Sequence, residues 1–97
     1  MKFGLSNEVI EKIRQTITTN PKVEEIIVYG SRAKGNYKSA SDIDITLKGD
    51  QLVLQDLNKL AIMLDDLLLP QKIDLSIYHH ISNADLLEHI ERIGQPL

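Results

Sequence analysis

Apolar residues recur with helical spacing in three segments of the chain. Residues 7–19 are apolar at positions three and four apart, which predicts a first helix that Pro21 ends. A longer apolar stripe predicts a second helix over residues 51–68. A third helix is predicted to begin after the capping sequence of residues 82–85 and to end at Gly94.

Three shorter segments between these helices have the pattern of β-strands. Residues 24–29 end in a continuous apolar run, whereas residues 43–48 and 72–78 alternate between apolar and polar positions. Alternation gives a strand one apolar face and one polar face. The predicted order is therefore α-β-β-α-β-α. It describes an α+β fold in which helices cover the apolar face of a small mixed sheet.

The composition fits one domain with an aliphatic core. The 97 residues are 42% hydrophobic but only 4% aromatic, so Ile, Leu and Val must form the core. We expect a single domain over residues 1–97. A formal net charge of −3 argues against direct binding of nucleic acid. The absence of cysteine excludes disulfides and thiolate zinc sites.

The chain carries no sign of membrane insertion or export. No run approaches the roughly 20 apolar residues of a membrane span. The first six residues lack the apolar core of a signal peptide. We therefore expect a cytoplasmic protein with no membrane partner.

The segment from Gly30 to Asp44 is the most informative about chemistry. It reads Gly-Ser-Arg-Ala-Lys-Gly-Asn-Tyr-Lys-Ser-Ala-Ser-Asp-Ile-Asp. Because a glycine lets the backbone approach a ligand closely, the Gly30–Ser31 pair after a strand can present amides to phosphate oxygens. Asp42 and Asp44 are two residues apart at the start of the next strand, so their side chains point from the same face.

A third carboxylate, that of Asp74, lies on the polar side of strand 72–78. If this strand pairs with strand 43–48, Asp74 converges with Asp42 and Asp44 on one open face. Clustered carboxylates repel one another unless cations neutralise them, and oxygen ligands select Mg²⁺ or Mn²⁺. Two ions bridged by Asp42 and Asp44 would suit attack by a hydroxyl on the α-phosphorus of a nucleoside triphosphate, assisted by Asp74.

Other groups of the motif could bind the triphosphate. We expect Ser31 and its neighbouring amides to hold the terminal phosphates, and Arg32 or Lys34 to neutralise the pyrophosphate that leaves. Each feature alone has an ordinary explanation, since a Gly-Ser pair is usually only a turn and an Asp-x-Asp pair usually faces solvent. Their agreement in register favours the functional interpretation.

The motif at residues 30–35, followed by Ser-Asp-Ile-Asp at residues 41–44, resembles the signature of the DNA polymerase beta-like nucleotidyltransferase superfamily. Within it, the chain is similar over nearly its full length to the minimal nucleotidyltransferase (MNT) family. The roles that this resemblance implies are phosphate binding by Gly30 and Ser31 and metal ligation by Asp42, Asp44 and Asp74.

The resemblance also implies a partner. Larger members of the superfamily append a helical domain that binds the base and the acceptor, whereas this sequence ends at Leu97. In MNT proteins the partner is commonly a helical HEPN protein, often a ribonuclease toxin that the MNT antitoxin adenylylates. The expected activity is Mg²⁺-dependent transfer of AMP from ATP to a hydroxyl of such a partner. Two alternatives are an aminoglycoside-like small acceptor and a regulator that binds its partner without catalysis.

The helix over residues 51–68 offers a second, independent indication of a partner. Ile62 falls among polar residues by helical spacing, and further apolar residues surround much of the helix: Leu52, Val53, Leu54, Met63 and Leu69. This pattern favours an oligomer or partner surface, with ordinary packing as the alternative.

Four other residues have side chains that could take part in a site. Tyr37, in the motif loop, could stack on a base or simply cover the turn. His79 and His80 are adjacent and would point to opposite sides of an extended chain, so we expect a solvated strand end. His89 is predicted to be a surface residue of the last helix.

Overall fold

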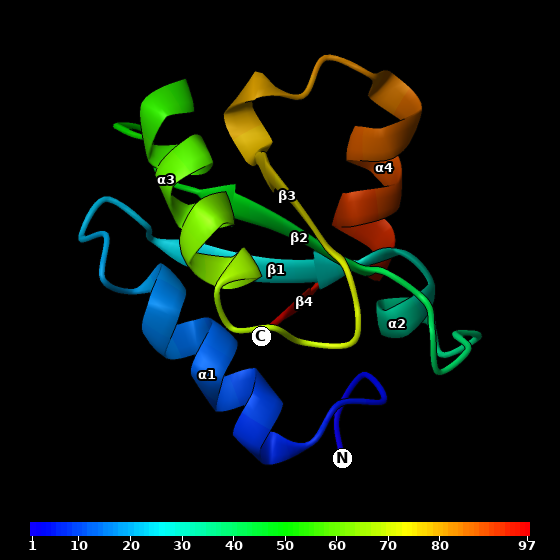
Figure 1. Cartoon of the computed structure of the whole chain (residues 1–97). Coiled ribbons are helices and arrows are strands. Elements are labelled where there is room, and N and C mark those ends of the chain that lie inside the picture. Colours follow the sequence, from blue (N-terminus) through cyan, green and yellow to red (C-terminus); the bar gives the residue numbers. More distant parts are fainter.

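A four-stranded β-sheet with helices on both sides organises the chain (Figure 1). The computed structural model describes all 97 residues. The elements in chain order are α1 (Asn7–Ile17), β1 (Glu25–Tyr29), α2 (Gly30–Lys34), β2 (Ile43–Lys48), α3 (Leu54–Asp65), β3 (Ile73–Ile77), the 3₁₀ turn η1 (Tyr78–His80), α4 (Ala84–Ile93) and β4 (Gln95–Pro96). The predicted α+β class is confirmed.

The sheet has the strand order β3-β2-β1-β4. β2 and β3 run parallel, and α3 provides the long crossover that a parallel pair requires. β1 lies antiparallel to both β2 and β4. The predicted pairing of the two alternating strands is therefore confirmed, and β2 lies between β1 and β3.

The apolar side of the sheet packs against α1 and α3 (Figure 1). Because successive strand residues face opposite ways, every second residue of β1 and β2 enters this core. Each fully buried Ile or Leu stabilises the fold by about 1.5–3 kcal/mol. The fully buried core side chains of the sheet and helices include Val28, Ile43, Ile45, Leu47, Ile13 and Ile17.

The opposite side of the sheet is only partly covered. Ile90 of α4 packs there with Ile27 and Tyr29 in a small second cluster. The expectation of helices on one face thus describes α1 and α3, whereas α4 lies against the other face. Asp74, on that other face, is exposed.

Side chains cap α1 and α4, and the cap of α4 lies within the predicted capping sequence of residues 82–85. Ser6 Oγ accepts the N–H of Val9 at the start of α1, and Asn83 Oδ1 accepts the N–H of Leu86 at the start of α4. α3 begins at Leu54, later than predicted, and is shorter than the apolar pattern suggested.

Three short elements were not predicted. Residues 30–34 were expected to be loop but form α2, which ends at Gly35 with φ +95°. η1 follows β3, and β4 pairs with β1. Elements this short carry too few residues for a periodic pattern. No helix combines the length and apolar character needed to cross a membrane.

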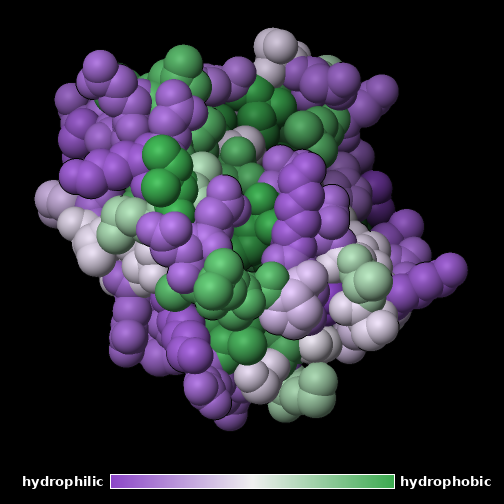
Figure 2. Space-filling view, in the orientation of Figure 1, coloured by the Kyte–Doolittle hydropathy of each residue, from purple (hydrophilic) through white to green (hydrophobic).

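Apolar side chains reach the surface on the side of the molecule that α3 faces (Figure 2). The predicted exposure of Ile62 is confirmed at 63%, and Leu54 is 61% exposed. Val53 and Leu68 are also exposed. Leu52, which the pattern had included in this surface, belongs instead to the core at 1% exposure.

Candidate active site

Three polar side chains stand in one row across the sheet. Tyr29 of β1 pairs in register with Asp44 of β2, and Asp44 pairs with Asp74 of β3. Side chains at paired positions share a face, with Cβ atoms about 4.5–5.5 Å apart. The row lies on the face opposite the main core. The neighbourhood of Asp44 and Asp74 that the alternating pattern predicted is confirmed.

Asp42 lies next to this row without closing it into a cage. It precedes β2 and is exposed, whereas Asp44 is half-buried. Nowhere in the chain do three His, Asp or Glu side chains surround one point closely enough to hold a metal ion by themselves. The three aspartates are thus neighbours along a shallow surface.

The three aspartates are close enough to interact electrostatically. Burial raises the pKa of Asp44, and the negative charges of Asp74 and Asp42 raise it further, while His89 opposes the shift. Burial also raises the pKa of the Tyr29 hydroxyl, the Ser76 hydroxyl lowers it, and the charges of Asp74 and Asp44 add to the rise. None of the four ion pairs in the molecule involves Asp42, Asp44 or Asp74.

This unneutralised charge fits a divalent cation. Carboxylate oxygens are the ligands that Mg²⁺ prefers, and a cation between like charges would relieve their repulsion. Because the protein supplies no closed cage, the remaining ligands must come from water or substrate, which is typical of Mg²⁺ held between carboxylates and phosphates.

Gly30 is fixed between two groups of the site. Its φ of +71° favours glycine, and a Cβ at this position would lie 2.2 Å from Asp44 Oδ2. Its N–H donates to His89 Nε2 at 3.0 Å. A side chain at position 30 would therefore displace the Asp44 carboxylate. The Gly30 N–H already donates to a histidine, so Ser31, in the first turn of α2, is the better candidate for binding phosphate.

His89 is a site residue that sequence reasoning missed. It was predicted to be a surface residue, but it is half-buried and accepts the Gly30 N–H. Its ring also meets the edge of the Tyr29 ring, with centroids 6.1 Å apart. The only sequence signal was its place one residue before Ile90, which is buried on the same face of the sheet as the site.

Arg32 and Lys34, the two cations of α2, differ completely in environment. Lys34 is exposed, as a phosphate contact requires. Arg32 is only 2% exposed, and its guanidinium donates to backbone carbonyls of its own neighbourhood. These contacts direct it away from any ligand, which speaks against the predicted role of Arg32 in neutralising pyrophosphate.

Of the other predicted aromatic residues, Tyr37 lies in the motif loop, whereas His79 and His80 lie at the opposite end of the sheet, near Glu25 and Lys48. Tyr37 is 37% exposed, and its ring lies 5.2 Å from the Arg32 guanidinium, so it covers the turn. His79 and His80 are exposed in η1 after β3, as predicted for a solvated strand end.

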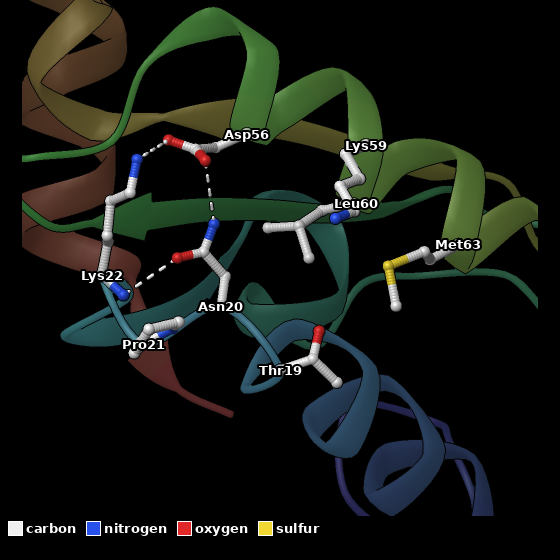
Figure 3. Close-up of a pocket in the computed structure, with 8 residues that line it drawn as sticks. All are labelled: Thr19, Asn20, Pro21, Lys22, Asp56, Lys59, Leu60 and Met63. Carbon is white, nitrogen blue, oxygen red and sulfur yellow. Dashed lines mark hydrogen bonds and ion pairs between the residues drawn. The ribbon is translucent and has the colours of Figure 1, made fainter.

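The site is an open surface, since none of the five cavities of the molecule is lined by Gly30, Ser31 or the three aspartates. One of these cavities, of about 250 Å³, lies at the far end of β1 between Lys22 and Met63 (Figure 3). Its polar wall is a closed network around Asp56.

A parallel strand pair thus presents acidic side chains beside Gly30 and Ser31 of α2, the arrangement that the motif predicted for a nucleotidyltransferase. The family model described as polymerase beta, nucleotidyltransferase matches residues 11–97. The chain therefore belongs to the polymerase beta nucleotidyltransferase family, and its activity is nucleotidyl transfer. The predicted family resemblance is confirmed.

Individual relatives agree with this assignment. The chain is 26% identical to a protein of Methanocaldococcus jannaschii, over 90% of this chain and 93% of the relative. That relative is named a protein adenylyltransferase, an activity assigned to it by inference. A chain in the crystal structure of a toxin–antitoxin with AMP-PNP is 28% identical, with a TM-score of 0.75. That match covers 94% of this chain and 72% of the other.

A more distant structure shows the shared fold alone. It contains a triply AMPylated HEPN toxin of Shewanella oneidensis in complex with an MNT antitoxin. The identity is 23% and the TM-score 0.60, with coverage of 93% of this chain and 66% of the other.

Proposed function

We propose that the protein transfers AMP from ATP to a hydroxyl group of a partner protein in a Mg²⁺-dependent reaction. The observation that carries this proposal is the pairing of Asp44 with Asp74 across β2 and β3, beside Gly30 and without any cation partner. The choice of ATP is supported by the similar structure that contains AMP-PNP.

Asp42, Asp44 and Asp74 are the residues that would hold Mg²⁺, with two ions as the expected number and Mn²⁺ as a possible substitute. When bound, Mg²⁺ supplies positive charge for the phosphates and lowers the pKa of the attacking hydroxyl. The half-buried Asp44 is the anchor of the set, because its position is fixed from both neighbouring strands.

The remaining groups of the chain have separate tasks in the reaction. The Ser31 hydroxyl donates to a phosphate oxygen, and the exposed Lys34 neutralises the terminal phosphates. The oxygen of the acceptor hydroxyl attacks the α-phosphorus. The bond that breaks joins this phosphorus to the oxygen that bridges the α- and β-phosphates. Pyrophosphate leaves, and the exposed carboxylate of Asp74 takes the proton of the hydroxyl.

The proposed partner is a helical HEPN-type protein, with this chain as the antitoxin of the pair. The toxin–antitoxin structure that is 28% identical supports the antitoxin role, and the HEPN–MNT complex that shares the fold suggests the kind of partner. The open site also supports a partner, since it leaves the acceptor to be presented by another molecule. The exposed apolar side chains of α3 offer a contact surface. Since ATP is an intracellular substrate, we place the reaction in the cytoplasm.

The test is to incubate the protein with α-labelled ATP, Mg²⁺ and a HEPN-type partner. The expected result is label on the partner that is lost with the Asp42→Ala, Asp44→Ala double variant. The matched control is Glu8→Gln, an exposed carboxylate of α1 outside both the site and the α3 surface, which should label normally.

Two other results would contradict the proposal. Label on an aminoglycoside and none on the partner would assign the enzyme to small acceptors. If the double variant still neutralised the toxicity of the partner in full, binding alone would account for the antitoxin effect.

A further inference from the structure

Arg32 is the most deeply buried charged residue of the chain, although it sits in the middle of the motif. Its side chain is in effect inaccessible, and no carboxylate pairs with it. A buried charge is tolerated only where hydrogen bonds replace its water. Arg32 obtains these bonds entirely from backbone carbonyl groups.

The carbonyls that Arg32 binds come from two segments far apart in the sequence. Nε and Nη2 donate to the carbonyl of Ser41 at 3.1 and 2.8 Å, and Nη2 also donates to that of Ser39 at 3.1 Å. Nη1 donates to the carbonyl of Phe3 at 3.0 Å. One guanidinium thus joins the N-terminal segment, α2 and the loop that leads to β2.

Tyr37 closes this arrangement from outside. Its ring lies over the guanidinium and also against Gly4, where a Cβ would be 2.2 Å from Tyr37 Cε2. Gly4 has φ +70°, so the tight turn of residues 2–5 brings the Phe3 carbonyl inward and leaves room for the ring. The N-terminal segment, the ring and the loop therefore form one packed unit.

The contact with Ser41 links this packed unit to the candidate site, because Ser41 directly precedes Asp42. Asp42 lies outside β2, so no strand pairing fixes it as it fixes Asp44. Two guanidinium nitrogens donate to the Ser41 carbonyl and so hold the peptide group between Ser41 and Asp42. The planar guanidinium donates hydrogen bonds in several fixed directions at once, which a lysine ammonium cannot reproduce.

We propose that Arg32 is a positioning residue that holds Asp42 in place beside Asp44, through the Ser41 carbonyl and the N-terminal segment. The inference rests on the proposed metal-dependent function and deepens it. Loss of an outer contact to a metal-binding side chain typically costs about 10–100-fold in metal affinity.

The experiment measures Mn²⁺ binding by NMR, with Mn²⁺ broadening the amide signals of nearby residues, together with amide hydrogen exchange. Wild type should show broadening at Asp42, Asp44 and Asp74. In Arg32→Gln we expect exchange to accelerate over residues 36–42, and broadening to weaken most at Asp42. The dissociation constant for Mn²⁺ should rise about tenfold or more.

The matched control is Arg14→Gln, which removes another arginine that donates to a main-chain oxygen, that of Leu97, away from the site. It should leave Mn²⁺ affinity unchanged even if it lowers the melting temperature. Tyr37→Ala removes only the covering ring and should give the Arg32→Gln pattern at smaller size, which decides the question if Arg32→Gln does not fold.

Different failures have different meanings. If wild type binds no Mn²⁺, the proposed function falls. If wild type binds Mn²⁺ and both Arg32→Gln and Tyr37→Ala match it in affinity and in exchange over residues 36–42, the positioning role of Arg32 is wrong and the proposed function stands.

Discussion

Two aspartates near opposite ends of β1, Asp56 of α3 and Asp44 of β2, are in opposite electrostatic situations. Near the start of β1, Asp56 accepts hydrogen bonds from Lys22 Nζ at 2.8 Å and from Asn20 Nδ2 at 3.2 Å (Figure 3). The bond from Lys22, followed by that from the Val53 N–H, holds the pKa of Asp56 below its ordinary value. Near the end of β1, Asp44 has no cation partner, and burial and two other aspartates raise its pKa.

The comparison separates a structural carboxylate from a functional one. The surroundings of Asp56 are what folding alone favours, because each acceptor has a donor. The surroundings of Asp44 cost stability, and a protein retains such a group where a ligand completes it. No lysine or arginine forms an ion pair with Asp44, so a metal ion and the phosphates that it binds can occupy this position.

The largest expected effect comes from removing the functional carboxylate. Asp44→Asn should lower nucleotidyl transfer by about 10–100-fold or more, since removing a ligand should cost no less than removing a contact to one. The fold should melt at or above the wild-type temperature, because a repulsive charge is gone. Transfer assays and calorimetry measure both. Asp56→Asn should do the reverse, with activity retained and melting temperature lowered. Equal activity in the two variants would remove the contrast.

Gly30→Ala tests whether the backbone at the end of β1 is shaped around Asp44. A left-handed conformation costs a non-glycine residue about 1–2 kcal/mol, which corresponds to a melting temperature lower by about 4–15 °C. The new Cβ would also displace the Asp44 carboxylate. We therefore expect a loss of transfer beyond what unfolding explains. Gly35→Ala, at φ +95° with open space around it, is the control that carries backbone strain alone. The same loss in both variants would mean that strain alone matters.

His89→Phe should have a smaller effect. The phenyl ring can keep the edge contact with Tyr29, but it cannot accept the Gly30 N–H. The net contribution of one hydrogen bond is about 1 kcal/mol, which corresponds to roughly a fivefold change in a rate or equilibrium constant. We expect about that loss in kcat, with recovery in His89→Gln, whose amide oxygen can accept. A fully active His89→Phe variant would show that the Gly30 amide needs no fixed partner.

The smallest effect is a change in pH dependence without metal. Because the pKa of Asp44 is raised in the folded state, its ionisation destabilises the fold as pH rises through that pKa. Asp74→Asn removes the stronger of the two neighbouring charges. It should add about 0.5 kcal/mol after solvent screening, or about 2–4 °C in melting temperature at pH 7. Saturating Mg²⁺ should reverse the order of wild type and variant.

Asp56 should give the opposite pH profile. Its folded pKa is lowered, so its contribution is present above the unfolded pKa and is lost as pH falls through the folded one. Asp56→Asn should therefore be less stable than wild type at neutral pH and approach it in acid. Parallel melting curves for the Asp56 and Asp74 variants between pH 3 and pH 7 would contradict this account.

The sequence predicted the part of the site that depends on strand alternation. Asp44 and Asp74 sit at polar positions of two alternating strands, and a parallel pairing in register was enough to join them. Burial of Arg32 could not be predicted, because a charged residue in a polar stretch is normally exposed, and its partner Phe3 lies 29 residues away. The contact of His89 with Gly30 spans 59 residues and leaves no local pattern.

A pH titration followed by ¹³C NMR of the Asp44 carboxyl would measure whether this carboxylate is held without a cation partner. We expect a pKa above the ordinary range for aspartate without metal, and a fall when Mg²⁺ and AMP-PNP are added. A value at or below the ordinary range without metal, unchanged by Mg²⁺ and AMP-PNP, would contradict this expectation.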